Sequence, residues 1–209
     1  MDKEKRERVD TYIQNLRERI RQAPFNGIAH YNLACALIGI GEYEEAKKEL
    51  LKAIDHAPHL CEAYVQLGGL ALREGDYEAC LKLNKKAVEI TPSFAVPHSN
   101  IGFIYLQQGK VDEAIGALKR ALELNPKLVQ ARTTLASAYL LKKEYDRCIE
   151  ECEIVINQEP AFGPAYNNMG IALMEKGEYK KAKEYFELAQ KNNYETPREI
   201  IEELERFLY

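Results

Sequence analysis

The stretch GEYEEAKKEL, residues 41–50, returns four times along the chain at a constant interval of 34 residues. The later copies are GDYEACLKLN, GKVDEAIGAL, KEYDRCIEEC and GEYKKAKEYF, which begin at Gly75, Gly109, Lys143 and Gly177. A fixed period in the range of roughly 20–50 residues is typical of stacked repeats, in which each unit contacts only its neighbours. The period therefore predicts an array of repeats and not one globular core.

Each repeat carries two helical patterns. In the first repeat His30, Leu33, Ala34 and Leu37 follow the i, i+3, i+4, i+7 spacing of one helix face. Gly41 supplies the positive φ that ends such a helix, and the decapeptide then starts a second helix. Proline cannot continue a helix, and a proline closes each of the first four repeats: Pro58, Pro92, Pro126 and Pro160.

Small residues recur where the two helices of a repeat would meet. Three positions show this, and their five members in chain order are Ala34, Gly68, Gly102, Ala136, Gly170; Ala46, Cys80, Ala114, Cys148, Ala182; and Ala53, Ala87, Ala121, Val155, Ala189. Small side chains allow two helices to approach closely. We therefore interpret Cys80 and Cys148 as small buried hydrophobic residues.

Composition limits the classes of function. The chain has 209 residues, 46% hydrophobic and 30% charged, with a formal net charge of −4. No apolar run approaches the ~20 residues of a membrane span, and the N-terminus is charged from its second residue, so we expect a cytoplasmic protein without membrane contact. The net negative charge disfavours nucleic acid as a partner.

Motifs for catalysis or metal binding are not found. The five cysteines form no CxxC pair, and His56, His59 and Cys61 lack a fourth ligand at a characteristic spacing. There is no phosphate-binding glycine loop, GxSxG or HExxH motif. We therefore expect no enzyme activity, no cofactor and no metal.

The pattern resembles the tetratricopeptide repeat, through the G-[ED]-Y-x-x-A turn, the small residues and the closing proline. The resemblance implies an all-α fold, a right-handed superhelical α-solenoid of antiparallel helix pairs, with a concave groove lined by the first helix of each repeat. The five repeats would span residues 27–60, 61–94, 95–128, 129–162 and 163–196.

Both ends of the array fit capping elements. Residues 1–26 resemble a degenerate half repeat, a helix with Val9, Tyr12, Ile13, Leu16 and Ile20 on one face. Residues 197–209 predict a C-terminal capping helix. Its start, TPRE, predicts Thr196 as N-cap, Pro197 in the first helical position and Glu199 completing a capping box.

The predicted groove carries a row of polar side chains at the repeat interval: Asn32, Gln66, Asn100, Thr134 and Asn168. Amide groups donate and accept, so the row can bind the backbone of an extended peptide; alternatively, it is merely solvated. Four other residues complete the predicted site: Tyr31, Phe103 and Ile171, as apolar or aromatic contacts, and Arg73. The absence of a basic pair argues against the carboxylate clamp of tetratricopeptide co-chaperones.

These features predict a protein–protein interaction scaffold that captures a peptide or helix in a neutral, partly apolar groove. Self-association through the ends, using Ile201, Leu208, Tyr209 or the N-terminal helix, is an alternative. A third hypothesis is RNA binding through the basic second helices, which carry Lys47, Lys48, Lys52, Lys82, Lys85, Lys86, Lys119 and Arg120.

The fourth copy of the decapeptide is the exception, because Lys143 replaces the glycine of the turn. Left-handed geometry at a lysine costs roughly 1 kcal/mol relative to glycine. We therefore predict local irregularity or looser packing in the fourth repeat.

Overall fold

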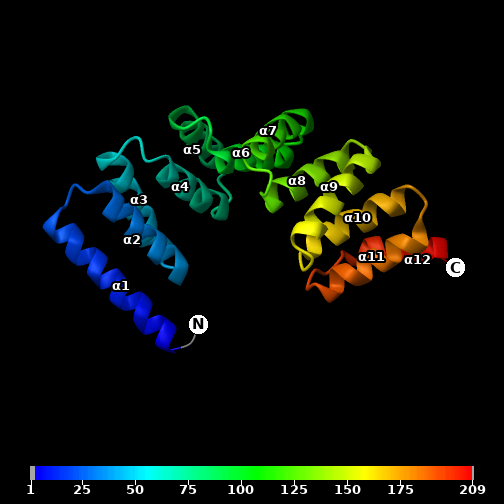
Figure 1. Ribbon diagram of the computed structural model, residues 1–209, viewed down its shortest axis with the longest axis horizontal. Coiled ribbons are helices and arrows are strands. Elements are labelled where there is room, and N and C mark those ends of the chain that lie inside the picture. Colours follow the sequence, from blue (N-terminus) through cyan, green and yellow to red (C-terminus); the bar gives the residue numbers. More distant parts are fainter. Residues whose placement is uncertain (1–2, 209) are drawn as a thin grey trace. The chain divides into compact units, whose positions relative to one another are not determined.

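The computed structural model describes the backbone of residues 3–208 and the side chains of residues 6–208. Within that range the chain forms twelve α-helices and no β-strand (Figure 1). It divides into two compact units, one ending at Pro97 and one beginning at His98. The predicted all-α solenoid of helix pairs is confirmed.

Unit 1 contains one leading helix and two helix pairs. Its helices are α1 (Lys3–Gln22), α2 (Gly27–Ile40), α3 (Tyr43–His56), α4 (Cys61–Arg73) and α5 (Tyr77–Ile90). Each helix packs on the next one along the chain. The aliphatic core includes Ile13, Leu16, Leu33, Leu37, Leu50 and Leu67. Full burial of one such leucine stabilises the fold by about 2 kcal/mol.

Unit 2 contains most of α6, then α7, two further helix pairs and the final helix α12. Its helices are α6 (Ala95–Gln107, whose first turn precedes the boundary), α7 (Val111–Leu124), α8 (Val129–Leu141), α9 (Tyr145–Gln158), α10 (Gly163–Glu175), α11 (Tyr179–Lys191) and α12 (Arg198–Leu208). Within this unit α8 packs on both α9 and α10, and α12 covers α11. The core includes Leu118, Leu135, Tyr139, Met169, Phe186 and Leu204.

The leading helix α1 packs on α2 through a narrower stripe than predicted. Ile13 and Leu16 are buried, and Val9 and Ile20 are partly buried against the same core. Tyr12 is 51% exposed, so its predicted place on the buried face is wrong. The contact follows the line through residues 9, 13, 16 and 20, and Tyr12 lies at its solvent edge.

The small residues do bring paired helices close together. A Cβ atom added to Gly102 would lie 2.6 Å from the Leu118 side chain, and one added to Gly170 would lie 2.5 Å from the Phe186 ring. At the corresponding position Ala34 and Ala136 are fully buried. A large side chain on the second helix thus requires a small one on the first.

The buried cysteines behave as predicted from their positions. Cys80 and Cys148 are 1% and 0% exposed, like the alanines at the same position in other repeats. Burial raises the pKa of the Cys80 thiol. These thiols are therefore packing residues and poor nucleophiles.

The turn between the two helices of each repeat has the same geometry in all five repeats. Gly41, Gly75, Gly109 and Gly177 have φ between 72° and 85°, and Lys143 has φ 59°. The Lys143 N–H donates to the Leu140 carbonyl at 2.9 Å, and the Glu144 N–H donates to the Tyr139 carbonyl at 2.9 Å. Gly41 and Glu42 make the corresponding two bonds in the first repeat.

The prediction of looser packing in the fourth repeat is therefore wrong. Its second helix buries Cys148, Cys152 and Val155 completely. The turn is regular, and only the backbone angle of Lys143 carries the cost of a side chain in left-handed geometry.

The start of α12 also differs from the prediction. The helix begins at Arg198, and the Pro197 carbonyl accepts from the Ile200 N–H at 3.0 Å. Thr196 is not an N-cap: its hydroxyl is buried and has no hydrogen-bond partner among the described residues. Thr196 stands where the preceding four repeats have a large apolar residue, Leu60, Phe94, Leu128 or Phe162. Packing at this apolar position turns its side chain inward and prevents capping.

Candidate functional site

The predicted site residues lie on the first helices of the repeats, and the boundary between the units divides them. Unit 1 carries Tyr31, Asn32, Gln66 and Arg73, on α2 and α4. Unit 2 carries Asn100, Phe103, Thr134, Asn168 and Ile171, on α6, α8 and α10.

In unit 1, Tyr31 and Gln66 come together across adjacent first helices. The Tyr31 hydroxyl lies near the Gln66 amide and the Cys35 thiol, which both influence its pKa. Burial, the Cys35 contact and the nearby Glu62 carboxylate together raise the pKa of Tyr31 to about 12. Tyr31 is therefore a neutral hydroxyl at all physiological pH values, able to donate and accept.

The same surface of unit 1 has two glycines with free space above them. Glycines at positions 39 and 69 are exposed, and a Cβ atom at either would meet nothing within 4 Å. Asn32 is half-buried and makes no hydrogen bond within the described residues. Backbone and amide groups are thus accessible here.

Arg73 does not join this group. Its guanidinium stacks on the Tyr43 ring, 3.7 Å from the ring centroid. This cation–π contact holds the side chain against the turn that precedes α3. Arg73 therefore cannot also cover Tyr31 in this arrangement.

In unit 2, two of the predicted polar residues use their hydrogen bonds internally. The Asn168 amide nitrogen donates to the Ser137 hydroxyl at 2.9 Å and to the Thr133 carbonyl at 3.4 Å. The Thr134 hydroxyl donates to the Gln130 carbonyl of its own helix at 2.8 Å. Asn168 is only 9% exposed, so its amide nitrogen ties α10 to α8 and is not open to a ligand. Asn100 and Phe103 are half-buried.

Unit 2 has an apolar depression at the C-terminal ends of its first helices. Its volume is about 560 Å³, and it is lined by Leu106, Gln107, Ser137, Leu140, Leu141, Lys143, Tyr145, Ile171 and Glu175. Among these, Leu141 is 63% exposed, which is unusual for a large apolar side chain. The Tyr145 hydroxyl donates to the Glu175 carboxylate at 2.9 Å.

Of the predicted site, only Ile171 lines this depression. Sequence reasoning missed Leu141, although a signal for it was present. Leu141 and Glu175 occupy the same repeat position as Arg73, two and three repeats later. Extending that position along the array would have found them.

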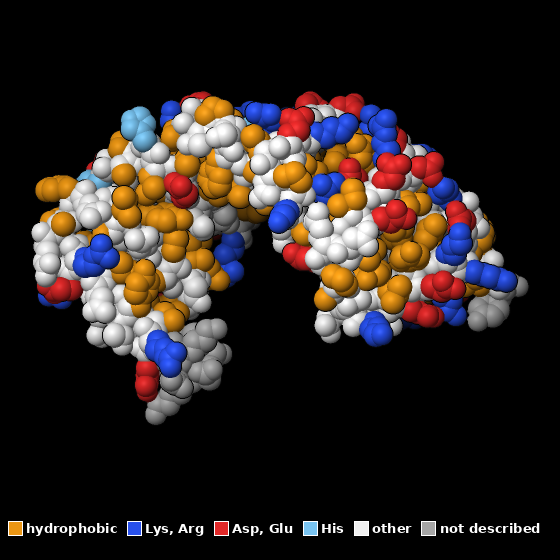
Figure 2. All heavy atoms as spheres, viewed as in Figure 1, with side chains coloured by type: hydrophobic (Ala, Val, Ile, Leu, Met, Phe, Trp, Pro, Cys, Tyr) orange, Lys and Arg blue, Asp and Glu red, His pale blue; other side chains and the backbone are white. Residues whose placement is uncertain are grey.

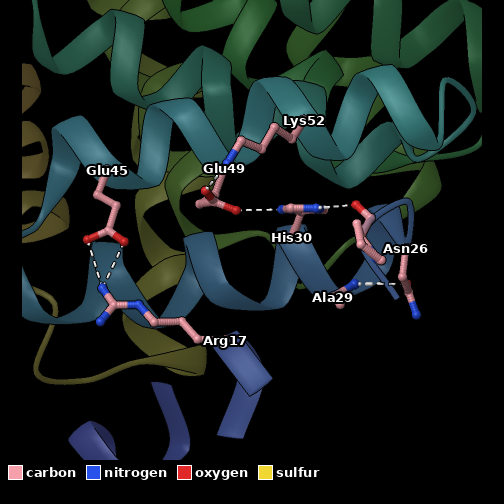
Figure 3. Close-up of polar contacts among 8 residues, drawn as sticks. Arg17, Asn26, Ala29, His30, Glu45, Glu49 and Lys52 are labelled. Atoms are coloured by element: carbon pink, nitrogen blue, oxygen red, sulfur yellow. Dashed lines mark hydrogen bonds and ion pairs between the residues drawn. The ribbon is translucent and has the colours of Figure 1, made fainter. Parts of the chain in front are cut away.

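The first repeat, in unit 1, carries a buried contact between His30 and Glu49. The His30 Nδ1 atom lies 2.5 Å from a Glu49 oxygen, and His30 Nε2 donates to the Pro24 carbonyl at 2.9 Å (Figure 3). Burial raises the pKa of Glu49, but hydrogen bonds from Lys52 and His30 outweigh it, and the pKa is lowered. Glu49 is therefore ionised at neutral pH, and its carboxylate accepts hydrogen bonds from Lys52 and from His30.

The fourth repeat has an ion pair at the same positions. Arg132 contacts the Glu151 carboxylate at 2.5 Å and donates to the Pro126 carbonyl at 3.1 Å. In the second and fifth repeats, Tyr64 and Tyr166 donate to the corresponding proline carbonyls. This contact anchors the start of each of these four first helices.

No cluster of three or more potential metal ligands occurs among the described residues. His56, from the predicted loop cluster, lies edge-on to the Phe25 ring at 5.3 Å between centroids. None of the helices in the described part of the chain is long and apolar enough to cross a membrane.

Sequence comparison with protein families identifies the fold. A tetratricopeptide repeat-like domain model matches residues 1–130, and two tetratricopeptide repeat models match residues 105–169 and 163–195. The chain belongs to the tetratricopeptide repeat family. No curated protein matches its sequence.

Several solved tetratricopeptide structures are similar to this chain. YrrB, a tetratricopeptide protein with an unusual peptide-binding site, is 21% identical with a TM-score of 0.67, covering 85% of this chain and 91% of YrrB. MamA is 25% identical with a TM-score of 0.66, covering 80% of this chain and 91% of MamA. A chain of the Cut9–Hcn1 assembly is 18% identical with a TM-score of 0.81, covering 96% of this chain and 40% of the Cut9–Hcn1 chain. Membership of this family supports a role as a protein interaction scaffold.

Proposed function

We propose that this tetratricopeptide protein is a non-enzymatic interaction module that binds a peptide segment of a partner along its first helices. The apolar depression of unit 2 carries the proposal. Its volume of about 560 Å³ lies in the usual range of roughly 300–1,000 Å³ for ligand pockets. Leu141 exposes apolar surface there that water solvates poorly, and a partner's apolar side chain would remove it from water.

Unit 1 offers a different kind of contact for a peptide. The Tyr31–Gln66 pair presents hydrogen-bonding groups, and the exposed glycines at 39 and 69 leave room for a bulky side chain. Extended peptides need partners for their backbone N–H and C=O groups as well as pockets for side chains. Unit 1 thus suits the backbone groups of a bound peptide, whereas the depression of unit 2 suits an apolar side chain.

RNA binding has less support, because several basic side chains on the second helices are paired with acidic ones. Lys47 contacts Glu74, Lys86 contacts Glu89, and Arg120 contacts Glu123. On the face drawn in Figure 2, basic and acidic side chains are intermixed over α7 and α9. Such pairing weakens these side chains as contacts for a phosphate backbone.

A peptide array tests the proposal. The array carries capped 12-residue peptides with central leucine or phenylalanine, and the full chain is compared with Ile171→Ala and with Phe103→Ala. The matched control is Ile154→Ala, which removes a partly exposed isoleucine from the second helix α9 of the same unit. We expect the Ile171 and Phe103 variants to lose binding about tenfold, with the control unchanged.

Two outcomes would contradict the proposal. Equal losses in all three variants would show that binding does not use the first helices. No binding by the wild-type chain, together with concentration-dependent mass in light scattering, would favour self-association instead.

A further inference from the structure

The turn at Lys143 combines backbone strain with a cation that has no internal partner. Of the five turns, four have glycine, and Lys143 alone places a long side chain at φ 59°. The other non-glycine residue with positive φ among the described residues is an asparagine, Asn193, a type that tolerates this geometry. The Lys143 side chain makes no hydrogen bond to the described backbone that would offset this geometry.

The strain is not offset by an ion pair. The neighbouring cations all have partners: Lys142 contacts Asp112, Arg147 contacts Glu144, and Lys176 contacts Asp146. The Lys143 side chain makes no hydrogen bond or ion pair with any described residue, and it is exposed. Strained residues that the fold does not need are typical of binding sites.

Lys143 lines the apolar depression of unit 2 together with Leu141 and Ile171. It is the only lysine or arginine among the lining residues. The single carboxylate there, Glu175, already accepts a hydrogen bond from Tyr145. The depression thus combines apolar side chains with the Glu175 carboxylate, which already accepts a hydrogen bond, and the Lys143 ammonium group, which has no partner among the described residues.

We propose that Lys143 selects the ligand of this depression: a peptide segment in which a large apolar side chain stands next to an aspartate or glutamate. The apolar side chain would lie against Leu141 and Ile171, and the carboxylate would accept a charge-assisted hydrogen bond from Lys143 Nζ. This inference rests on the proposed function and specifies, in addition, that the bound segment carries an acidic residue. Because Glu175 also lines the depression, the acidic group is favoured only on the Lys143 side.

The test uses capped 12-residue peptides with a central leucine or phenylalanine. Within each matched set, the residue beside it is aspartate, asparagine or lysine, and the rest of the peptide is constant. Wild-type chain is compared with Lys143→Gly and Lys143→Arg. An exposed ion pair supports a preference of about threefold to fivefold for aspartate over asparagine at low salt. We expect Lys143→Gly to lose this preference while still binding the asparagine peptides, and Lys143→Arg to keep it.

Thermal unfolding of the same variants tests the strain independently. Lys143→Gly restores the residue of the other four turns, so its Tm should rise by about 2–4 °C although its selectivity falls. Gly41→Lys is the matched control, since it adds the same strain at a turn that does not line the depression. It should lower the Tm and leave peptide selectivity unchanged.

The outcomes separate this inference from the proposed function. Wild-type binding without preference for aspartate overturns the role of Lys143 and leaves peptide binding in place. Absence of binding to every peptide overturns both. A Tm for Lys143→Gly at or below that of the wild-type chain overturns the argument from strain.

Discussion

The first repeat, in unit 1, and the fourth repeat, in unit 2, use the same positions for different chemistry. Where the first repeat pairs His30 with Glu49, the fourth pairs Arg132 with Glu151, and both His30 and Arg132 also bond the preceding proline carbonyl. The comparison teaches that the repeat geometry requires a donor at this position but does not specify which one. Arginine offers a planar group of five N–H donors at this position, whereas histidine offers two ring nitrogens.

The largest expected effect comes from breaking the pair of the first repeat. In His30→Leu the Glu49 carboxylate, with a side chain only 9% exposed, loses its buried partner and keeps only Lys52. We expect a loss of about 3 kcal/mol in the free energy of unfolding, measured by urea denaturation.

The second repeat supplies the control for this prediction. It has Tyr64 and Leu83 at the positions of His30 and Glu49. The double variant His30→Tyr, Glu49→Leu copies that solution and should recover most of the loss. If it is less stable than His30→Leu, the two repeats are not equivalent at this position.

The pH dependence of stability sharpens the same comparison. The pKa of Glu49 is lowered below its ordinary value of 4.5, so folding favours the ionised carboxylate. This contribution is fully present above pH 4.5 and is lost as the pH falls through the lowered pKa. Urea denaturation between pH 3 and 7 should show a shallower acid decline in Glu49→Gln than in the wild-type chain, and parallel declines would contradict the assignment.

Exchanging the turns is expected to have a smaller effect. Gly41→Lys gives the first repeat the turn residue of the fourth, at a position with φ 85°. The hydrogen bonds of the turn should remain, and the free energy of unfolding should fall by about 1 kcal/mol. An unchanged midpoint in urea would mean that a lysine costs nothing in this turn.

The smallest expected effect concerns an exposed ion pair close to the buried one. Arg17 contacts Glu45 at 2.8 Å, with about half of each side chain exposed, and Figure 3 shows it beside the His30–Glu49 pair. Arg17→Ala should cost at most about 0.5–1 kcal/mol, and less in high salt. A loss as large as that of His30→Leu would show that burial does not explain the difference.

The site was harder to predict than the fold. Asn168 was expected to offer its amide to a peptide, but the amide nitrogen bonds Ser137 in the neighbouring repeat. A row of amides in sequence cannot reveal whether the adjacent helix carries an acceptor within reach. Lys143 was not assigned to the site, because its turn meets Leu106 and Ile171 of the neighbouring repeats only after the repeats stack.

The sequence by itself determined the repeat length, the paired helices, the small packing positions and the five turns. These features depend on residues close in the chain and on a period that recurs without interruption. Tertiary structure alone decided how Lys143 is accommodated, where Thr196 points, and which polar groups remain free. The Lys143 turn keeps its local hydrogen bonds at a backbone angle that residue type alone disfavours, while the other outcomes depend on burial and on contacts between residues about one repeat apart.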